Sequence, residues 1–368
     1  RGIADLMGRG ALQDQVLHGF AHHQEFIDRR AALVARLLAG GAAAAPQDLS
    51  RQLRDAELLP QHRLGRPGLA AVLTDDPHEA LPPSNLAALE NFIRVGNRLG
   101  VDVELIEKKD YARLAEYDAL LIRETTSVDN HTYRFAKKAE SEGLVVMDDP
   151  ASILRCTNKV YLTDLLKRHG LGMPATEVLY KERPDELEQV ARRLGFPLVL
   201  KIPDGCFSKG VIKVQNAQEM QEAASTLFEH SVLLLAQEYL YTEYDWRIGV
   251  LNRKPIFACQ YFMSKGHWQI YNHKATAADI NGECRTMAIH DAPKAVVDLA
   301  VRTANLIGDG LYGVDLKQSG ERVVVIEVND NPNLDAGIED AWLQDDLYAL
   351  VLEEFIRRLD VKRRGLAS

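Results

Sequence analysis

The sequence predicts an α/β protein in which a small parallel α/β unit is followed by a larger part of mixed α+β type. Two patterns indicate this. Short apolar runs alternate with helix-length segments between residues 67 and 150, as in a parallel sheet with crossover helices. Beyond Trp246, apolar runs are separated by turn residues, which is typical of antiparallel strands. With 368 residues and 46% hydrophobic content, the chain is long enough for two or three globular domains.

The first 66 residues are rich in Ala, Leu, Arg and Gln, and their apolar pairs recur at helical spacing. Gly40, Gly41 and Pro46 interrupt that spacing. The pattern predicts a helical N-terminal segment, 1–66, to which we assign no chemistry.

The parallel α/β unit is predicted to span residues 67–150. Its expected elements are a strand at Leu69–Leu73, a helix at Ser84–Leu99, strands at Val101–Ile106 and Tyr117–Ile122, a helix at His131–Glu142 and a strand at Leu144–Met147. The unit contains no glycine-rich dinucleotide fingerprint. The segment Arg123–Thr126 ends the third strand, where open α/β sheets bind ligands. Both a substrate contact and a loop satisfied by its own hydrogen bonds fit that position.

The second part is predicted to span residues 151–360 and to end in a solvated tail, 361–368. Its expected elements are a helix at Asn158–His169, strands at Ala175–Tyr180, Leu198–Ile202, Ile212–Val214 and Val232–Gln237 with a helix at Ala217–Glu229 among them, antiparallel strands at Trp246–Val250 and Pro255–Phe262, and a closing helix at Trp342–Leu359.

A hairpin near the C-terminus is predicted to bring three oxygen-bearing side chains together. Ser319-Gly320 indicates the turn, between strands at Leu311–Leu316 and Val323–Val328. Asp315 then lies roughly opposite Glu327, and Glu327 and Asn329 share one face because side chains alternate along a strand. Carboxylate and amide oxygens suit Mg²⁺ or Mn²⁺. The favoured interpretation is a divalent-metal site, and the alternative is an ordinary polar face of a hairpin.

A glycine loop upstream is a candidate phosphate site. A strand that ends at Lys201 leads into the loop Pro203–Val211. Its glycines let backbone N–H groups approach an anion, and Ser208 and Lys209 add a hydroxyl and a positive charge. The loop is not a Walker loop, because no helix follows it. An ordinary hairpin with a surface lysine is the alternative. Downstream, the extended segment 236–240 has a backbone that can pair with an adenine edge.

The order of these pieces resembles the ATP-grasp superfamily. The order is a lysine on a helix, a lysine before a glycine loop, Gln-Glu-Tyr-Leu, Asp-Trp-Arg and then the acidic hairpin. The resemblance is greatest to the RimK-like amino-acid ligases, which share a fold with glutathione synthetases, and it covers roughly Leu69–Leu359. The stretch Ala119–Leu165 looks like the subgroup with a RimK-like N-terminal domain, although residues 1–66 match no intact accessory domain. The resemblance implies an ATP-grasp fold after a pre-ATP-grasp domain, with a lid at about 173–240.

The resemblance also implies a set of site residues. The nucleotide-binding set comprises Lys159, Lys201, Ser208, Lys209, Gly210, Glu238, Tyr239, Leu240, Asp245, Asn272 and Lys274. Within it, Glu238–Leu240 resemble the adenine-contacting linker and Asp245 the acid near the ribose. Arg247 resembles the catalytic arginine near the transferring phosphate, and Asp315, Glu327 and Asn329 resemble the metal ligands. His267 and His273 lie between these segments, either as general bases or as exposed loop histidines.

An ATP- and Mg²⁺- or Mn²⁺-dependent carboxylate–amine ligase is the implied activity. Such an enzyme forms an acyl phosphate, which an amine attacks, so that an amino acid such as glutamate is joined to a peptide, a protein or a small acid. Three alternatives stay open. They are an ATP-grasp enzyme of another product class (a dipeptide-type ligase or a phosphotransferase), a non-catalytic ATP-binding regulator, and a scaffold whose N-terminal segment recruits partners.

Composition limits the kinds of partner and the cellular location that we expect. A net charge of -9 argues against a general nucleic-acid surface. No apolar run reaches the roughly 18 residues of a membrane span, and Arg1–Gly10 lacks the apolar segment of a signal peptide, so we expect a cytoplasmic protein. The scattered cysteines are expected to be reduced thiols: Cys156, Cys206, Cys259 and Cys284. A homo-oligomer remains open.

Overall fold

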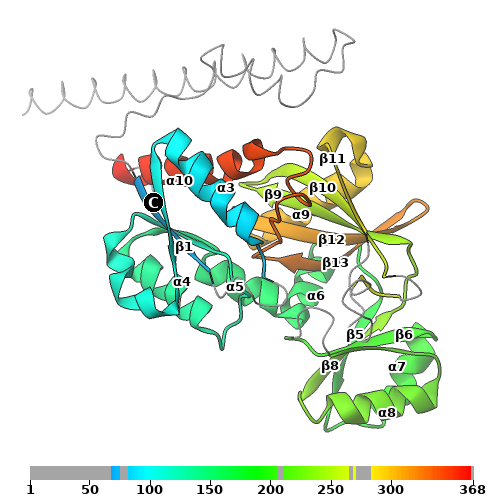
Figure 1. The fold of residues 1–368 in the computed structure, drawn as a ribbon. Helices are drawn as coiled ribbons and strands as arrows, with labels where there is room; N and C mark the ends of the chain where they lie inside the picture. The colour runs from blue at the N-terminus through cyan, green and yellow to red at the C-terminus, as the bar shows by residue number, and fades with distance from the viewer. Residues whose placement is uncertain (1–67, 75–81, 205–209, 265–267, 271–282, 366–368) are drawn as a thin grey trace, which may run out of the picture. The chain divides into compact units, whose positions relative to one another are not determined.

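The computed structural model describes residues 68–74, 82–204, 210–264, 268–270 and 283–365. The chain divides into two compact units, Arg1–Arg63 and Leu64–Ser368. The predicted helical segment 1–66 lies outside the described residues. Within the second unit, the described residues form one parallel sheet and two antiparallel sheets with their helices, as Figure 1 shows.

The parallel sheet has four strands in the order β2-β1-β3-β4. Its elements are β1 (Gly68–Leu73), α3 (Leu86–Leu99), β2 (Val101–Ile106), the 3-10 helix η1 (Lys108–Glu116), β3 (Ala119–Ile122), α4 (His131–Glu142) and β4 (Val145–Met147). Every residue of β3 is buried, as expected for a parallel sheet covered on both faces. The Asn85 side chain caps the start of α3, and Gly100 (φ 73°) ends it in the left-handed conformation. The predicted alternation of strands and helices is confirmed.

Two consecutive helices follow the parallel sheet, α5 (Pro150–Thr157) and α6 (Lys159–Arg168). Asp149 caps α5, and Asn158 both ends α5 and accepts a hydrogen bond from the Tyr161 N–H at the start of α6. Only the second helix was expected from the sequence. Because Asn158 takes an extended conformation between the helices, α6 begins at Lys159.

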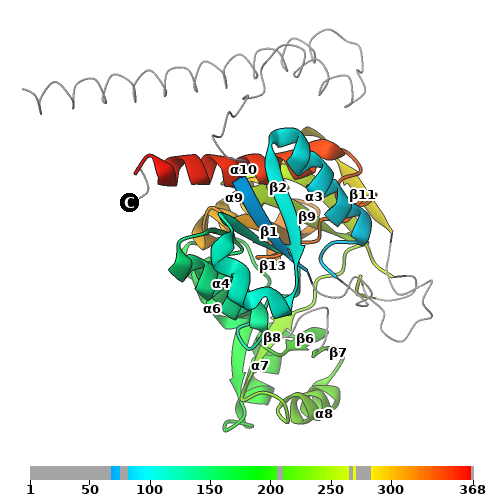
Figure 2. The same ribbon diagram turned by 60° about the vertical axis from the view of Figure 1, so that its left-hand side comes forward.

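A second sheet has the order β5-β8-β6-β7 and is antiparallel. Its elements are β5 (Thr176–Tyr180), α7 (Glu186–Leu194), β6 (Leu198–Lys201), β7 (Val211–Val214), α8 (Ala217–Leu227) and β8 (Leu233–Glu238). Figures 1 and 2 show α7 and α8 together on one side of this sheet. They enclose a separate apolar core that includes Leu198, Leu200 and Leu234. Helix α7 was not predicted.

The third sheet has five strands in the order β11-β10-β9-β12-β13. Its elements are β9 (Tyr244–Leu251), β10 (Lys254–Phe262), β11 (Cys284–Met287), the 3-10 helix η2 (Ile289–Asp291), α9 (Lys294–Ile307), β12 (Leu311–Ser319) and β13 (Arg322–Asn329). Helix α9 packs on β9, β12 and β13 and shares an apolar core with them. The predicted hairpin is confirmed, whereas β11 and α9 were missed.

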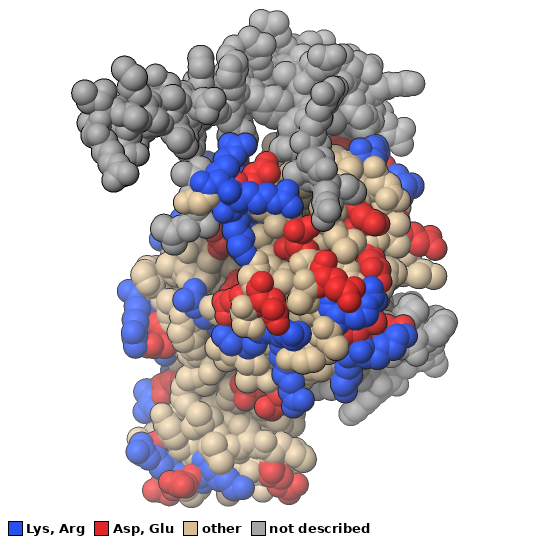
Figure 3. Space-filling model, turned by 90° about the vertical axis from the view of Figure 1, so that its left-hand side faces the viewer, with Lys and Arg blue, Asp and Glu red and all other residues tan. Residues whose placement is uncertain are grey.

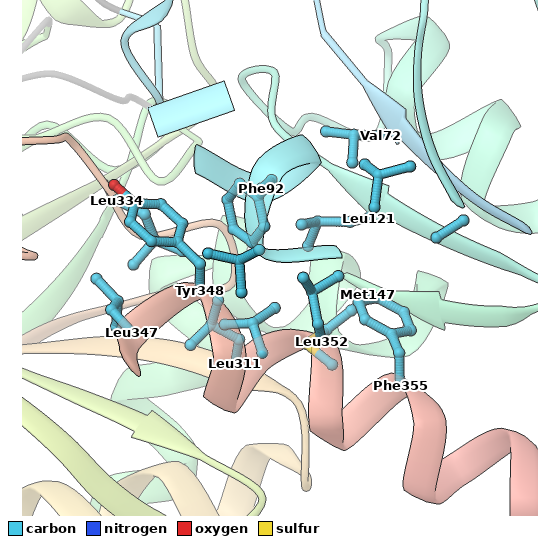
Figure 4. Packing of buried hydrophobic residues seen from close by; sticks show 14 of the residues in the cluster. Val72, Phe92, Leu121, Met147, Leu311, Leu334, Leu347, Tyr348, Leu352 and Phe355 are labelled. Atoms are coloured by element: carbon cyan, nitrogen blue, oxygen red, sulfur yellow. The ribbon is translucent and has the colours of Figure 1, made fainter. Parts of the chain in front are cut away.

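The closing helix, α10, is Asp345–Arg363 and packs against α3, although the two are far apart in the sequence. Figure 4 shows the core that they share, where Phe92 of α3 contacts Tyr348 of α10 edge to face with ring centroids 4.9 Å apart. Leu311 and Leu121 connect the same core to the third and the parallel sheets. The expected bounds of this helix, Trp342–Leu359, were shifted, because residues 336–344 form turns and Lys362 and Arg363 suit a helix C-terminus.

No helix in the described part of the chain is long and apolar enough to cross a membrane. On the face in Figure 3, acidic and basic side chains are interspersed. Cys156, Cys259 and Cys284 carry free thiols, and Cys206 lies outside the described residues.

Candidate active site

A row of three charged residues crosses the third sheet. Asp315 of β12 pairs in register with Arg247 of β9 on one side and with Glu327 of β13 on the other. Directly paired residues of antiparallel strands share a face, so the three side chains project together. The opposite face is the apolar one against α9, with Ile248 and Val314. The predicted pairing of Asp315 with Glu327 is therefore confirmed.

The row is held by hydrogen bonds in which the acids accept. Arg247 donates to Asp315 twice, from Nε to Oδ1 (2.7 Å) and from Nη2 to Oδ2 (2.8 Å), in a forked ion pair. Asn329 Nδ2 donates to Asp315 Oδ2 (3.1 Å) and to the Gly313 carbonyl (3.3 Å). Asp315 thus lies between Arg247 and Asn329.

Glu327 is paired with a lysine from another element. Lys159, the first residue of α6, places Nζ 2.7 Å from Glu327 Oε1. The helix start therefore brings the predicted lysine to the predicted acid. Burial acts to raise the pKa of Glu327, but the charges of Lys159, Lys201 and Arg247 outweigh burial and leave that pKa lowered. In Asp315 burial prevails over Arg247, and the pKa is raised.

Lys201 reaches the same region from the second sheet. It is the last residue of β6, and its Nζ donates to Gln237 Oε1 (2.7 Å), while Gln237 Nε2 donates to Thr176 Oγ1 (2.9 Å). Burial lowers the pKa of Lys201 to about 8. The positive charges of Lys159 and Lys317 lower this pKa further, whereas the negative charge of Glu327 raises it. A half-buried lysine whose hydrogen-bond acceptor, Gln237, is neutral is well suited to an added anion.

Asp245 lies at the start of β9 and is paired with Lys317 of β12. Lys317 Nζ is 2.5 Å from Asp245 Oδ1 and 2.8 Å from Thr242 Oγ1. Thr242 Oγ1 also donates to Asp245 Oδ1 (2.9 Å). The carboxylate is therefore fixed in place by two partners at the edge of the charged row.

The segment Glu238–Leu240 follows β8. Arg322 of β13 donates to both carboxylate oxygens of Glu238, each at 2.7 Å, and the Ala175 N–H donates to Oε2 (3.1 Å). The ring of Tyr239 has Lys213 Nζ 3.7 Å from its centroid, which is a close cation–π contact. These contacts hold the side chains of Glu238 and Tyr239.

A cavity of about 580 Å³ brings these residues together. The predicted residues that line it are Lys159, Lys201, Glu238, Tyr239, Leu240, Asp245, Arg247, Asp315, Glu327 and Asn329. Gly210 does not line it; Ile202 Cδ1 is 2.8 Å from where a Cβ on Gly210 would lie. Ser208, Lys209, Asn272 and Lys274 lie outside the described residues, as do His267 and His273.

Some cavity residues were assigned no side-chain role from the sequence, among them Gln237 and Lys317. Lys317 was detectable, since it lies two residues after Asp315 on one strand and so shares its face. Gln237 stands directly before the recognised Glu238. The partners of both residues come from distant segments, which a single sequence does not show.

The segment after β3 divides between two roles. Thr125 and Thr126 line the cavity. The Arg123 side chain is buried at 1% exposure and makes hydrogen bonds within the protein, and Glu124 contacts His131, with 2.5 Å between Oε2 and Nε2. Thr125 and Thr126 are therefore placed for a ligand contact, whereas Arg123 and Glu124 are satisfied by hydrogen bonds within the protein.

Comparison with known proteins adds the family. A model of the RimK-like ATP-grasp domain matches residues 156–344. A probable alpha-L-glutamate ligase of Vibrio vulnificus (strain YJ016) is 28% identical over 248 residues, which is 67% of this chain and 78% of that protein. A probable alpha-L-glutamate ligase of Alkalilimnicola ehrlichii is 28% identical over 258 residues, covering 68% and 81%.

Solved structures show the same fold. The D-alanine–D-alanine ligase of Bacillus anthracis has a TM-score of 0.60 at 17% identity, over 82% of this chain and 100% of that one. A RimK domain ATP-grasp protein of Sphaerobacter thermophilus has a TM-score of 0.55 at 18% identity, over 76% and 98%. The predicted ATP-grasp fold is confirmed. The chain therefore belongs to the RimK-like ATP-grasp family and is an ATP-dependent, ADP-forming carboxylate–amine ligase.

Proposed function

We propose that this ligase joins an amino acid such as glutamate to the carboxylate of a peptide, a protein or a small acid, with Mg²⁺ or Mn²⁺ held by Asp315, Glu327 and Asn329. One observation carries the proposal. A single cavity of about 580 Å³ is lined by Lys159, Lys201 and Arg247 together with these three oxygen-bearing residues. Glutamate is the choice because the named relatives are probable alpha-L-glutamate ligases.

The donor set fits a magnesium ion bound together with a nucleotide. Among the described residues, no three His, Cys, Asp or Glu side chains gather as a protein-only metal centre would. Two carboxylates and one amide do converge, through the pairing of Asp315 with Glu327 and of Gly313 with Asn329. Magnesium commonly takes one or two carboxylates and fills its other positions with phosphate oxygens and water. When bound, the ion would offset negative charge on the β- and γ-phosphates.

The positive side chains are assigned to the phosphates. The positive charges of Lys159 and Lys201 both act to lower the pKa of Glu327. Arg247, with side-chain exposure of 11%, reaches the row from β9. In this role Lys159 and Lys201 hold phosphate oxygens, and Arg247 stabilises the charge that develops at the transferring phosphoryl group. Glu238–Leu240 and Asp245 are assigned to adenine and ribose, and Ser208, Lys209, Gly210, Asn272 and Lys274 to the remainder of the nucleotide site.

The reaction has two steps. A carboxylate oxygen of the acceptor attacks the γ-phosphorus, the bond from that phosphorus to the β–γ bridging oxygen breaks, and ADP leaves. The amine nitrogen then attacks the acyl carbon of the acyl phosphate, the carbon–oxygen bond to phosphate breaks, and the amide forms with loss of one proton. Since water competes with the amine at this stage, the cavity must hold the amine close to the acyl carbon.

A substrate screen tests the proposal. The purified protein is incubated with ATP, Mg²⁺ and pairs of an amino acid with an acidic peptide or small acid, and ADP and the amide product are measured together. We expect equal amounts of ADP and amide for at least one pair that includes glutamate, and loss of both on chelation of the metal. ADP formation that needs glutamate but yields a phosphorylated hydroxyl would contradict the proposal and indicate a phosphotransferase.

A further inference from the structure

Arg123 is a buried cation outside the charged row. It directly follows β3 at the carboxyl edge of the parallel sheet, where a ligand contact is expected. Its side chain instead turns into the protein, with 1% exposure. A guanidinium carries five N–H donors in a rigid fork, and burying it without partners is costly. Its partners therefore show what the residue holds together.

The partners of Arg123 come from two distant segments. The first is the segment before α3, in which Ser84 Oγ (2.9 Å from Nε) and the Pro83 carbonyl accept hydrogen bonds from Arg123. The second is the loop after β13, in which the Pro332 carbonyl (2.8 Å from Nη2) and Asn331 Oδ1 accept hydrogen bonds from Arg123. We call this set the Arg123 clamp: Arg123, Pro83, Ser84, Asn331 and Pro332. It joins the parallel unit to the loop that follows Glu327 and Asn329.

Direct hydrogen bonds between the two segments reinforce the clamp. The Leu334 N–H donates to the Pro83 carbonyl (2.9 Å), and Ser84 Oγ donates to the Leu334 carbonyl (3.0 Å). Next along the chain, the Asn85 N–H donates to Asp335 Oδ1 (2.6 Å). The loop after β13 is thus attached to the parallel unit at successive residues.

The other side of the same loop touches the charged row. Pro332 packs on Gly313 so closely that a Cβ there would lie 2.6 Å from Pro332 Cβ and 3.4 Å from Arg247 Cδ. Asn333 Oδ1 lies 3.4 Å from Arg247 Nη1, as the acceptor. Pro83, Asn331, Pro332 and Asn333 all line the cavity. A shift of the loop would therefore move one cavity wall relative to Arg247.

We propose that Arg123 is a positioning residue that fixes the cavity wall formed by residues 331–333 between the parallel unit and Arg247, and so holds the attacking amine against the acyl phosphate. This inference rests on the proposed function. It places Arg123 outside contact with the substrates, since its side chain is 1% exposed and makes four hydrogen bonds to protein acceptors. If the wall shifts, the acyl phosphate still forms but the amine meets it more slowly, and water takes its place.

Arg123→Lys tests the inference, because lysine keeps the charge but loses the forked geometry. The first readout is hydrogen exchange of the Leu334 amide in the full chain, which we expect to speed up. The second is the ratio of ADP to amide product, which we expect to rise about tenfold, since misplacement of reacting groups costs 10- to 100-fold in rate. The affinity for an ATP analogue should change by less than about threefold.

Two further variants keep the test decisive. Ser84→Ala removes a single clamp partner, so it should give the same two effects to a smaller degree even if Arg123→Lys fails to fold. Arg358→Lys is the matched control, because Arg358 also donates to a backbone carbonyl, that of Asp309, but does not line the cavity. It should leave the product ratio unchanged.

The outcomes distinguish failure of the inference about Arg123 from failure of the proposed function. Unchanged Leu334 exchange in both clamp variants overturns the clamp, whatever the activity. Faster exchange with an unchanged product ratio overturns the positioning role. If the unaltered protein makes no ADP with any pair, the proposed function fails, and Leu334 exchange still reports on the clamp.

Discussion

At the residue scale, the site depends on the electrostatic pairing of half-buried side chains. Asp315 pairs with Arg247 and Glu327 with Lys159, so that two negative charges face two positive charges in the cavity. A nucleotide adds negative charge and a metal adds positive charge, so the bound state can preserve the balance while exchanging partners. Removing one member takes the opposite charge away from its partner, which costs more than the pair contributes.

Glu327→Gln should reduce turnover far more than it weakens binding of ATP. Glutamine keeps an oxygen that accepts from Lys159, but it lacks the charge that a metal requires. We expect kcat to fall at least about a hundredfold and the Kd for an ATP analogue to change less than about tenfold. Turnover and calorimetric titration measure the two. Glu321→Gln, an exposed residue of the same hairpin, is the control. Equal losses of kcat and affinity would contradict the role of Glu327 as a metal ligand.

Lys201 should make nucleotide affinity depend on pH. Its pKa is lowered to about 8 by burial, so the side chain loses its charge as the pH rises through that value. Only the charged form attracts phosphate, and bound phosphate in turn raises the pKa. We expect the affinity for an ATP analogue to be constant below about pH 7 and to decrease as the pH rises from about 7 to about 9.

Lys201→Arg provides the comparison, because arginine stays charged throughout this range. Its affinity for the analogue, titrated in the same buffers, should be level over the range in which the unaltered protein weakens. Parallel curves for the two proteins would assign the pH dependence to another group.

At the element scale, the sequence predicted the hairpin because its signals are local. Gly320 has φ 60°, as its turn requires, and the β-branched run from Val323 sets β13. Counting outward from that turn brings Asp315 close to Glu327, and a register shift between Asp315 and Leu316 makes Glu327 its direct partner. The register of β12 with β9, which brings in Arg247, involves strands about seventy residues apart and cannot be counted in this way.

Helix α9 shows the opposite case. It begins after Pro293 and buries Val296, Ala300, Ala304 and Ile307, which are at helical spacing. The pattern was available in the sequence, but it was not recognised among small residues without strong cap signals. The hydrogen bonds of Arg123 to Asn331 and Pro332 could not be predicted, because they join segments some two hundred residues apart.

Gly313→Ala should separate the hairpin from the loop that follows it. The new methyl group would lie 2.6 Å from Pro332 Cβ, so Pro332 must move. We expect a loss of about 1–3 kcal/mol in the free energy of unfolding, together with lower turnover. Ser319→Ala, on the exposed end of β12, should leave both unchanged. Denaturant titration and steady-state kinetics measure the effects. Normal turnover in Gly313→Ala would show that the site tolerates displacement of the loop.

At the scale of the whole molecule, apolar cores divide the described part of the chain. One core joins the parallel sheet, α3 and α10 to Leu311 and Phe257 of the third sheet (Figure 4). The core of the second sheet contains only residues of that sheet and its two helices. Lys201 and Gln237 lie on this separately stabilised unit, and the acids lie on the third sheet. Nucleotide binding therefore depends on how the second sheet is placed relative to the third sheet.

Leu234→Ala and Leu352→Ala should consequently differ. Both side chains are buried, and each truncation should cost about 2–5 kcal/mol locally. In Leu234→Ala we expect faster hydrogen exchange confined to residues 176–238 and weaker binding of an ATP analogue. In Leu352→Ala we expect faster exchange in α3, α10 and the parallel sheet. Exchange that rises uniformly in both variants would show that the cores unfold as one.

The central claim is that the cavity aims ATP at a carboxylate. It is tested most directly with an acceptor from the substrate screen whose carboxylate carries ¹⁸O, followed by mass spectrometry of the released phosphate. An acyl phosphate leaves one acceptor oxygen on phosphorus, so we predict one ¹⁸O atom per phosphate in step with the amide formed. Amide formation with unlabelled phosphate would contradict carboxylate activation by ATP in this protein.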